Sequence, residues 1–172
     1  MLEFHKHYLS NSRRDLISKS SSYKNINGLS KIDFLSLDFL KSKNSKSFAI
    51  RALCFFYFFL GFKGNVRLYS KPGLKKSIFC DLELVHRKDI FLFMEKYYYN
   101  ILYKEAPERF LKSSLSNTGT FSFMIKDILD FVELEESIFR FRNLENFKVT
   151  FVFSTSKIAE NLNLLRSLGF IF

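Results

Sequence analysis

The chain has 172 residues and a mass of 20.4 kDa, which is the length of one domain, and its 47% hydrophobic residues suffice for a core of ordinary size. Its formal net charge of +10 favours a polyanionic partner or an anionic membrane surface. The longest apolar run, residues 52–62, is shorter than the roughly 20 residues of a transmembrane helix, and the polar N-terminus does not resemble a secretory signal, so we expect no membrane insertion.

The first part of the chain is polar and then becomes apolar. Residues 1–30 are Ser-rich and basic, so we expect an N-terminal arm or short helix there, followed by a single α+β domain over residues 31–172. The apolar density of residues 31–39 predicts a strand. The apolar run after Ser47 is too long for a typical strand and stops at Gly61, so it predicts a buried helix.

Two more strands and a helix are predicted in the middle of the chain. Apolar residues alternate with polar ones at residues 65–69 and 78–85, and a Pro-Gly turn lies between these two runs. Asp89 then fits the N-cap of a helix that continues to Ile101.

The remaining chain predicts two strands and a last helix. Alternation places the strands at residues 121–125 and 147–153, and Thr155 or Ser156 can cap a helix that Gly169 ends. The order of elements lacks the regular alternation of a doubly wound sheet. We therefore predict an α+β fold with a mixed or antiparallel sheet of about five strands, backed by helices.

Positive charge is concentrated in the first part of the sequence. Residues 1–76 hold 15 Lys or Arg and 4 acids, whereas residues 77–172 hold 12 and 13. This asymmetry favours one face that contacts phosphate, and several cations also cluster across the Pro-Gly turn. We expect RNA phosphate contacts from Lys31, Arg67, Lys71, Lys75 and Lys76.

No catalytic or metal-binding constellation is visible in the sequence. Neither a nucleophile elbow nor a phosphate-binding P-loop occurs, and the paired histidines near the N-terminus lack further ligands. Both cysteines, Cys54 and Cys80, lie in apolar runs, which is typical of buried free thiols in a reducing compartment. Four acidic residues lie close together in the sequence: Asp130, Glu133, Glu135 and Glu136. We interpret them as a solvated edge or a protein contact rather than as an acid/base pair. We therefore expect a protein that is not an enzyme and has no cofactor.

Five segments, in order along the chain, resemble motifs of one known family. They are LGFKGNVRLYSK at residues 60–71, CDLELVHRKD at 80–89, GTFSFMIKD at 119–127, FKVTFVFSTSK at 147–157 and LLRSLGFIF at 164–172. Together they resemble the large-subunit ribosomal protein L-five family, which binds five-S ribosomal RNA. The third segment, for example, is similar to that family's G-N-Y-[ST]-x-G-[IV]-[KR]-E strand.

The resemblance implies a structural role in the central protuberance of the large subunit. The expected partners are five-S RNA or the RNA that replaces it, neighbouring large-subunit proteins, and a small-subunit head protein of the S-thirteen type. The last contact would form an intersubunit bridge and suits the acidic residues Glu133, Glu135 and Glu136. The segment between Lys71 and Cys80 is about half of the family's basic loop, which weighs against the family's contact with P-site transfer RNA.

The composition also bears on location. Abundant Phe, Lys, Ser, Asn and Ile are typical of a T- and A-rich genome, so we expect a mitochondrial ribosome, with a plastid or the bacterial cytoplasm as alternatives. Two other functions stay open at this point. One is an organelle RNA-binding factor outside the ribosome, and the other is a membrane-associated protein that uses the Phe-rich stretch as an anchor.

Overall fold

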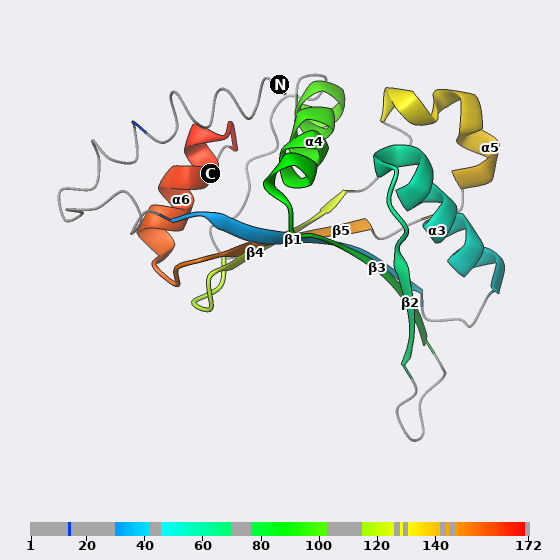
Figure 1. The fold of residues 1–172 in the computed structure, drawn as a ribbon, viewed down its shortest axis with the longest axis horizontal. Coiled ribbons are helices and arrows are strands. Elements are labelled where there is room, and N and C mark those ends of the chain that lie inside the picture. Colours follow the sequence, from blue (N-terminus) through cyan, green and yellow to red (C-terminus); the bar gives the residue numbers. More distant parts are fainter. Residues whose placement is uncertain are drawn as a thin grey trace. The chain divides into compact units, whose positions relative to one another are not determined.

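The computed structural model describes residues 14, 30–41, 46–69, 77–102, 115–125, 128, 131–141, 144 and 147–170. Five strands form an antiparallel sheet in the order β2-β3-β1-β5-β4, and four α-helices accompany it in the described part of the chain (Figure 1). The predicted α+β class is confirmed. Apart from residues 14 and 30, the predicted N-terminal arm lies outside the described residues.

The elements follow the predicted order, with additions. The strands are β1 (Ile32–Lys41), β2 (Asn65–Tyr69), β3 (Ser77–Leu84), β4 (Thr120–Ile125) and β5 (Phe147–Phe153). The α-helices are α3 (Lys46–Leu60), α4 (Arg87–Tyr97), α5 (Ile138–Phe141) and α6 (Ile158–Ser167). A π-helical turn η3 (Tyr98–Leu102) follows α4, and a 3-10 helix η6 (Val132–Ser137) precedes α5. The sequence did not predict η6 and α5.

The chain divides into two compact units, each built from separated stretches of sequence. The first unit comprises Met1–Leu35, Val85–Ser122 and Thr150–Phe172, and the second comprises Ser36–Leu84 and Phe123–Val149. Strands β1, β4 and β5 contribute residues to both units.

Phenylalanine rings form the core of the second unit. Phe39 on β1 stacks on Phe147 on β5 with ring centroids 4.7 Å apart, and Phe55 on α3 contacts both rings edge-on at 5.1 and 5.2 Å. Phe59, one turn later on α3, lies 4.4 Å from Phe131. Such ring pairs add roughly 0.5–1.5 kcal/mol each beyond the burial of their area.

Helix α3 is only partly the buried helix that the sequence predicted. Its inner face is buried at a helical spacing, through Phe48, Ala52, Phe55, Phe56 and Phe59. Its outer face also carries large apolar side chains, which are exposed. Of the helices that the structure describes, none has both the length and the apolar character needed to cross a membrane.

The core of the first unit joins α4, α6 and the strands. The ring of Phe170, just after α6, lies 5.7 Å from Phe151 on β5, 5.8 Å from Phe121 on β4 and 6.1 Å from Tyr97 on α4. Gly169 precedes it with φ 93°, and its N–H donates to the Arg166 carbonyl. The Phe170 N–H donates to the Leu165 carbonyl, which completes the hydrogen-bond pattern of a glycine-terminated helix. The predicted end of this helix is therefore confirmed.

Both predicted helix caps are wrong. Helix α4 is capped at His86, so Asp89 lies inside its first turn, and α6 is capped at Lys157 rather than at Thr155 or Ser156. Neither capping residue makes a side-chain hydrogen bond to its helix. An acidic residue inside the first turn, Asp89 in α4 and Glu160 in α6, still interacts favourably with the positive end of the helix dipole.

A substitution at Gly119 tests the close backbone contact between the chain just before β4 and the chain just after β5. Its φ is 78°, and a Cβ built there would lie 2.6 Å from the Thr155 carbonyl oxygen. We expect Gly119→Ala to lower the free energy of unfolding by about 1–3 kcal/mol more than Gly61→Ala does, measured by denaturant titration. Gly61 is a matched control because its φ is 79° with nothing within 4 Å, so it isolates the backbone strain. Equal losses in the two variants would contradict a close approach at Gly119.

Candidate nucleic-acid interface

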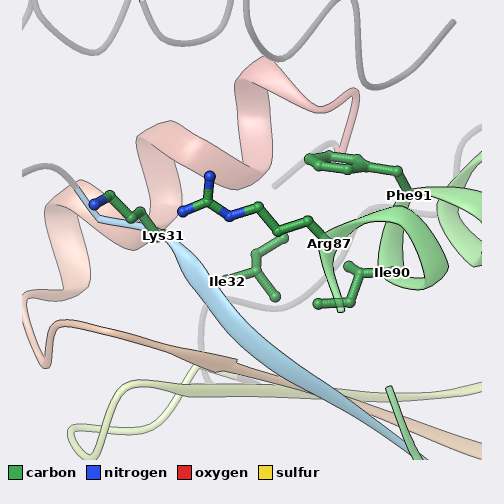
Figure 2. Close-up of a pocket in the computed structure, with 5 residues that line it drawn as sticks. All are labelled: Lys31, Ile32, Arg87, Ile90 and Phe91. Atoms are coloured by element: carbon green, nitrogen blue, oxygen red, sulfur yellow. The ribbon is translucent and has the colours of Figure 1, made fainter. Parts of the chain in front are cut away.

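Two cations line one pocket in the first unit. The pocket is bounded by Lys31 and Ile32 at the start of β1 and by Arg87, Ile90 and Phe91 in the first turns of α4. Figure 2 shows the guanidinium of Arg87 extending from the start of α4 toward Lys31. In the described part of the chain, neither side chain forms an ion pair. Two adjacent cations that are not neutralised suit a bound phosphate.

The backbone on both sides of Lys31 is fixed by hydrogen bonds. The Lys31 N–H donates to the Ser154 hydroxyl at 3.0 Å, and the Lys31 carbonyl accepts from the Ser154 N–H at 2.9 Å. Ser154 directly follows β5, so these bonds attach the start of β1 to the end of β5. The backbone position of Lys31 is therefore set by the sheet itself.

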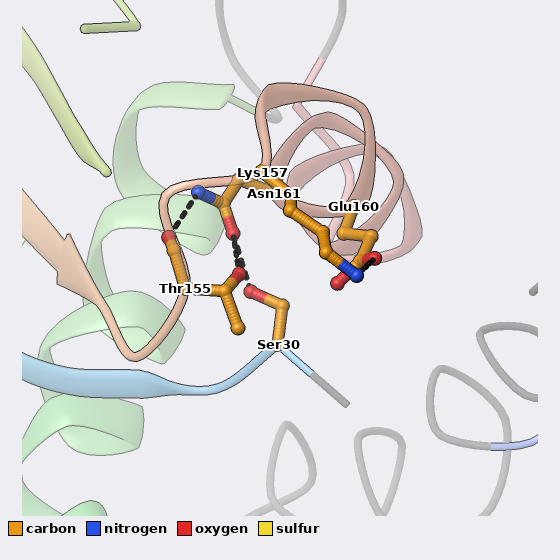
Figure 3. Close-up of polar contacts among 5 residues, drawn as sticks. All are labelled: Ser30, Thr155, Lys157, Glu160 and Asn161. Atoms are coloured by element: carbon orange, nitrogen blue, oxygen red, sulfur yellow. Dashed lines mark hydrogen bonds and ion pairs between the residues drawn. The ribbon is translucent and has the colours of Figure 1, made fainter. Parts of the chain in front are cut away.

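A buried polar cluster holds the preceding residue (Figure 3). The hydroxyls of Ser30 and Thr155 both donate to the side-chain oxygen of Asn161, and the Asn161 amide donates to the Thr155 carbonyl at 2.9 Å. Asn161 and Ser30 are buried, so all of these groups need partners. The cluster attaches the chain just before Lys31 to the first turn of α6.

Arg87 is positioned by the start of α4. The N–H groups of Asp89 and Ile90 donate to the His86 carbonyl, while Arg87 and Lys88 are the first two residues of the helix and are exposed. Ile90 and Phe91 are buried and fix the helix against its surroundings. Arg87 was not among the predicted RNA contacts, because this part of the sequence was interpreted only through Asp89 as a helix N-cap. Arg87 and Lys88 directly precede the predicted N-cap, and two cations beside a helix N-terminus, whose free N–H groups also favour anions, were the signal that could have identified it.

Arg67, also predicted to contact RNA phosphate, forms ion pairs in the second unit. Its Nη2 lies 3.0 Å from Asp81 Oδ2 and 3.6 Å from Glu83 Oε1, across the β2–β3 pair. The Arg67 side chain is 51% exposed, whereas that of Asp81 is 3% exposed. Arg67 thus compensates a buried carboxylate, and a phosphate would have to compete with two acids for it. Lys71, Lys75 and Lys76 lie outside the described residues.

Acidic side chains dominate the sheet face around Arg67. Burial raises the pKa of Asp81, Arg67 opposes this shift, and Glu83 reinforces it. Burial also raises the pKa of Asp38 on β1, and a hydrogen bond from the Ser36 hydroxyl at 2.8 Å and the charge of Lys148 oppose the shift. One oxygen of Asp81, Oδ1, is buried with no hydrogen-bond partner. Among the side chains that the structure describes here, three carboxylates face two cations, which suits phosphate less well than the Lys31–Arg87 pocket does.

Of the residues expected to contact a protein, Glu133 and Glu136 are exposed on η6. The side chain of Glu135 lies outside the described part of the structure. Among the described residues, no three His, Cys, Asp or Glu side chains are grouped closely enough to hold a metal ion.

The comparisons with known proteins bear on the fold. No protein-family model and no curated protein matches the chain. Among solved structures, the chain is similar to Mth689, a DUF54 protein from Methanothermobacter thermautotrophicus, with a TM-score of 0.51 and 14% sequence identity. The match covers 80% of this chain and 97% of that one. At this identity the likeness supports the α+β fold alone.

The buried carboxylate of Asp38 predicts a dependence of stability on pH. Because its folded-state pKa is raised, the folded chain holds the proton more tightly, and stability decreases as the pH rises from the ordinary value of 3.8 through the raised value. Asp38→Asn keeps an acceptor for Ser36 and removes the charge. We expect it to raise the melting temperature at pH 7, with a gain that shrinks toward about pH 4. The control is Asp33→Asn, an exposed carboxylate on the same strand, and a loss of stability in Asp38→Asn at pH 7 would contradict the account.

The Lys31–Arg87 pocket predicts two phosphate contacts. We expect Lys31→Gln and Arg87→Gln each to reduce the slope of log affinity against log salt by about 0.7–1, measured with a short oligouridine, because each removes one cation from a phosphate. Arg166→Gln is the control, since Arg166 is an exposed cation on α6 of the same unit but does not line the pocket. A slope that changes equally in all three variants would show diffuse attraction without a pocket.

Proposed function

We propose that the chain is a structural, RNA-binding component of the large ribosomal subunit and that it is not an enzyme. Its RNA partner would be five-S ribosomal RNA or the RNA that replaces it in the central protuberance. The proposed location is the mitochondrial ribosome, with a plastid or bacterial ribosome as alternatives.

The carrying observation is the convergence of Lys31 and Arg87 on one pocket. These residues are 56 positions apart in the sequence, and each is held by its own set of backbone contacts. Cations fixed by a folded scaffold bind phosphate with a smaller loss of side-chain entropy than flexible ones do. Two cations on a fixed backbone are suited to positioning an RNA backbone, a contact that carries no sequence information by itself.

The ribosomal assignment rests on the ordered resemblance to the L-five family. The segments that carry it coincide with structural elements: residues 119–127 include β4, residues 147–157 include β5, and residues 164–172 include the glycine-terminated end of α6. The segment at residues 80–89 joins β3 to α4 and contains Arg87. Five weak motifs that fall in order on such elements support the family more than any one of them does.

Two further contacts are part of the proposal. Neighbouring large-subunit proteins and a small-subunit head protein of the S-thirteen type would be the protein partners, and the exposed residues Glu133 and Glu136 are assigned to the latter. A contact with P-site transfer RNA is not proposed, because the segment after Lys71 is short.

The direct test is sedimentation of the source-cell lysate through a sucrose gradient. Mass spectrometry across the fractions locates the chain, and sequencing of the RNA in its peak names the bound RNA. We expect the chain to co-migrate with large subunits, and we expect the double variant Lys31→Gln/Arg87→Gln to be depleted from that peak several-fold while Arg166→Gln is retained. Migration as a small free ribonucleoprotein would instead favour an RNA-binding factor outside the ribosome, and recovery only in salt-washed membranes would contradict both.

A further inference from the structure

Helix α3 exposes an apolar stripe on the side opposite to its buried face. Tyr57 and Phe58 lie seven and eight residues after Ile50, about two turns along the helix, which places them on the same side of it. Tyr57 is 60% exposed and Phe58 is 54% exposed. Single exposed apolar residues are ordinary, but a row of large ones along a helix marks an interaction site.

A neighbouring segment of the same unit also exposes apolar side chains. Helix α5 packs beside α3, with the ring of Phe141 6.1 Å from that of Phe58 and the Arg140 guanidinium 5.9 Å from the Phe58 ring (Figure 1). Next to Arg140, the side chain of Phe139 is 85% exposed, and Val132 at the start of η6 is exposed as well. We call the set Ile50, Tyr57, Phe58, Val132 and Phe139 the aromatic surface.

The charges around the aromatic surface distinguish among possible partners. Glu133 and Glu136 lie on η6 beside Val132, and Arg140 lies on α5 beside Phe139; all three are exposed. RNA and anionic membranes both require a surface of net positive charge, and two carboxylates next to the apolar residues disfavour both. Exposed aromatic residues with an arginine and a mixed charged rim are instead typical of protein–protein interfaces.

We propose that the aromatic surface is the docking surface for another protein, one that packs apolar side chains against Phe139 and Tyr57 and presents Lys or Arg to Glu133 and Glu136. The glutamates were expected to contact a protein from the sequence; the apolar anchors and the participation of α3 come from the structure. The inference does not depend on RNA binding or on a place in the ribosome.

A site-specific photocrosslink tests this proposal. A benzophenone is attached to the full chain at Phe139→Cys in a Cys54→Ala background, since Cys80 is buried and Cys54 is only half-buried. The labelled protein is illuminated in an extract of its source cells, and the crosslinked peptide is identified by mass spectrometry. We expect one defined peptide of another protein, carrying both apolar and basic residues. Crosslinks to RNA, to lipid or to a second copy of this chain, or no crosslink at all, would each overturn the proposal.

Matched variants show whether the crosslink reports docking. The same label at Val85→Cys, an exposed apolar position in the first unit, should not yield that peptide. Tyr57→Ser and Glu136→Lys should each lower the yield roughly tenfold, the effect expected of a central interface residue, whereas Tyr57→Phe should retain it. Circular dichroism establishes that each variant is folded. An undiminished yield in both Tyr57→Ser and Glu136→Lys would also contradict the proposal.

Sedimentation with large subunits is measured separately, so a failure of the ribosomal assignment is distinguishable from a failure of docking.

Discussion

The stacked pair of Phe39 and Phe147 is the contact on which much of the second unit depends. It joins the central strand β1 to β5, and Phe55 contacts both rings from α3, so one cluster attaches two strands and a helix. Because side chains alternate between the two faces of a strand, burial of Phe39 and Phe147 places their neighbours Asp38 and Lys148 on the opposite face. The ring pair thereby places Asp38 on the same face as Lys148, whose charge opposes the rise in the pKa of Asp38 that burial causes.

The abundance of phenylalanine also explains the exposed apolar surface. A helix that packs on a sheet buries one face, and α3 carries more large apolar residues than that face contains. The surplus, represented by Tyr57 and Phe58, remains on the outer side. Compositional bias alone would scatter such residues, whereas here they follow one side of α3 and continue beside Arg140 on α5. Their arrangement, more than their number, is the reason for assigning them a partner.

Local patterns predicted the elements that have a clear period, and the misses have physical causes. The alternation in β5 and the glycine at the end of α6 could be predicted from the sequence because each is a property of adjacent residues. The ion pairs of Arg67 could not be predicted from the sequence, because they depend on the β2–β3 register, which pairs Asn65 with Asp81. Residues 131–141 form short helical turns without a repeated apolar spacing, so they were interpreted only as an acidic edge. Convergence of Lys31 with Arg87 required tertiary structure.

Charge is distributed differently between the two halves of the sequence and between the two compact units. Residues 1–76 and 77–172 differ in net charge by 12, from +11 to −1. The two compact units each draw on both parts of the sequence, and their ranges contain 14 Lys or Arg with 8 Asp or Glu in the first unit and 13 with 9 in the second. A basic half of the sequence is therefore not a basic half of the molecule. What distinguishes the faces is local pairing: acids neutralise Arg67 in the second unit, whereas Lys31 and Arg87 share a pocket whose other described lining residues are apolar. If the chain binds phosphate as proposed, the first unit is the better site, because none of the described residues that line its pocket is an acid.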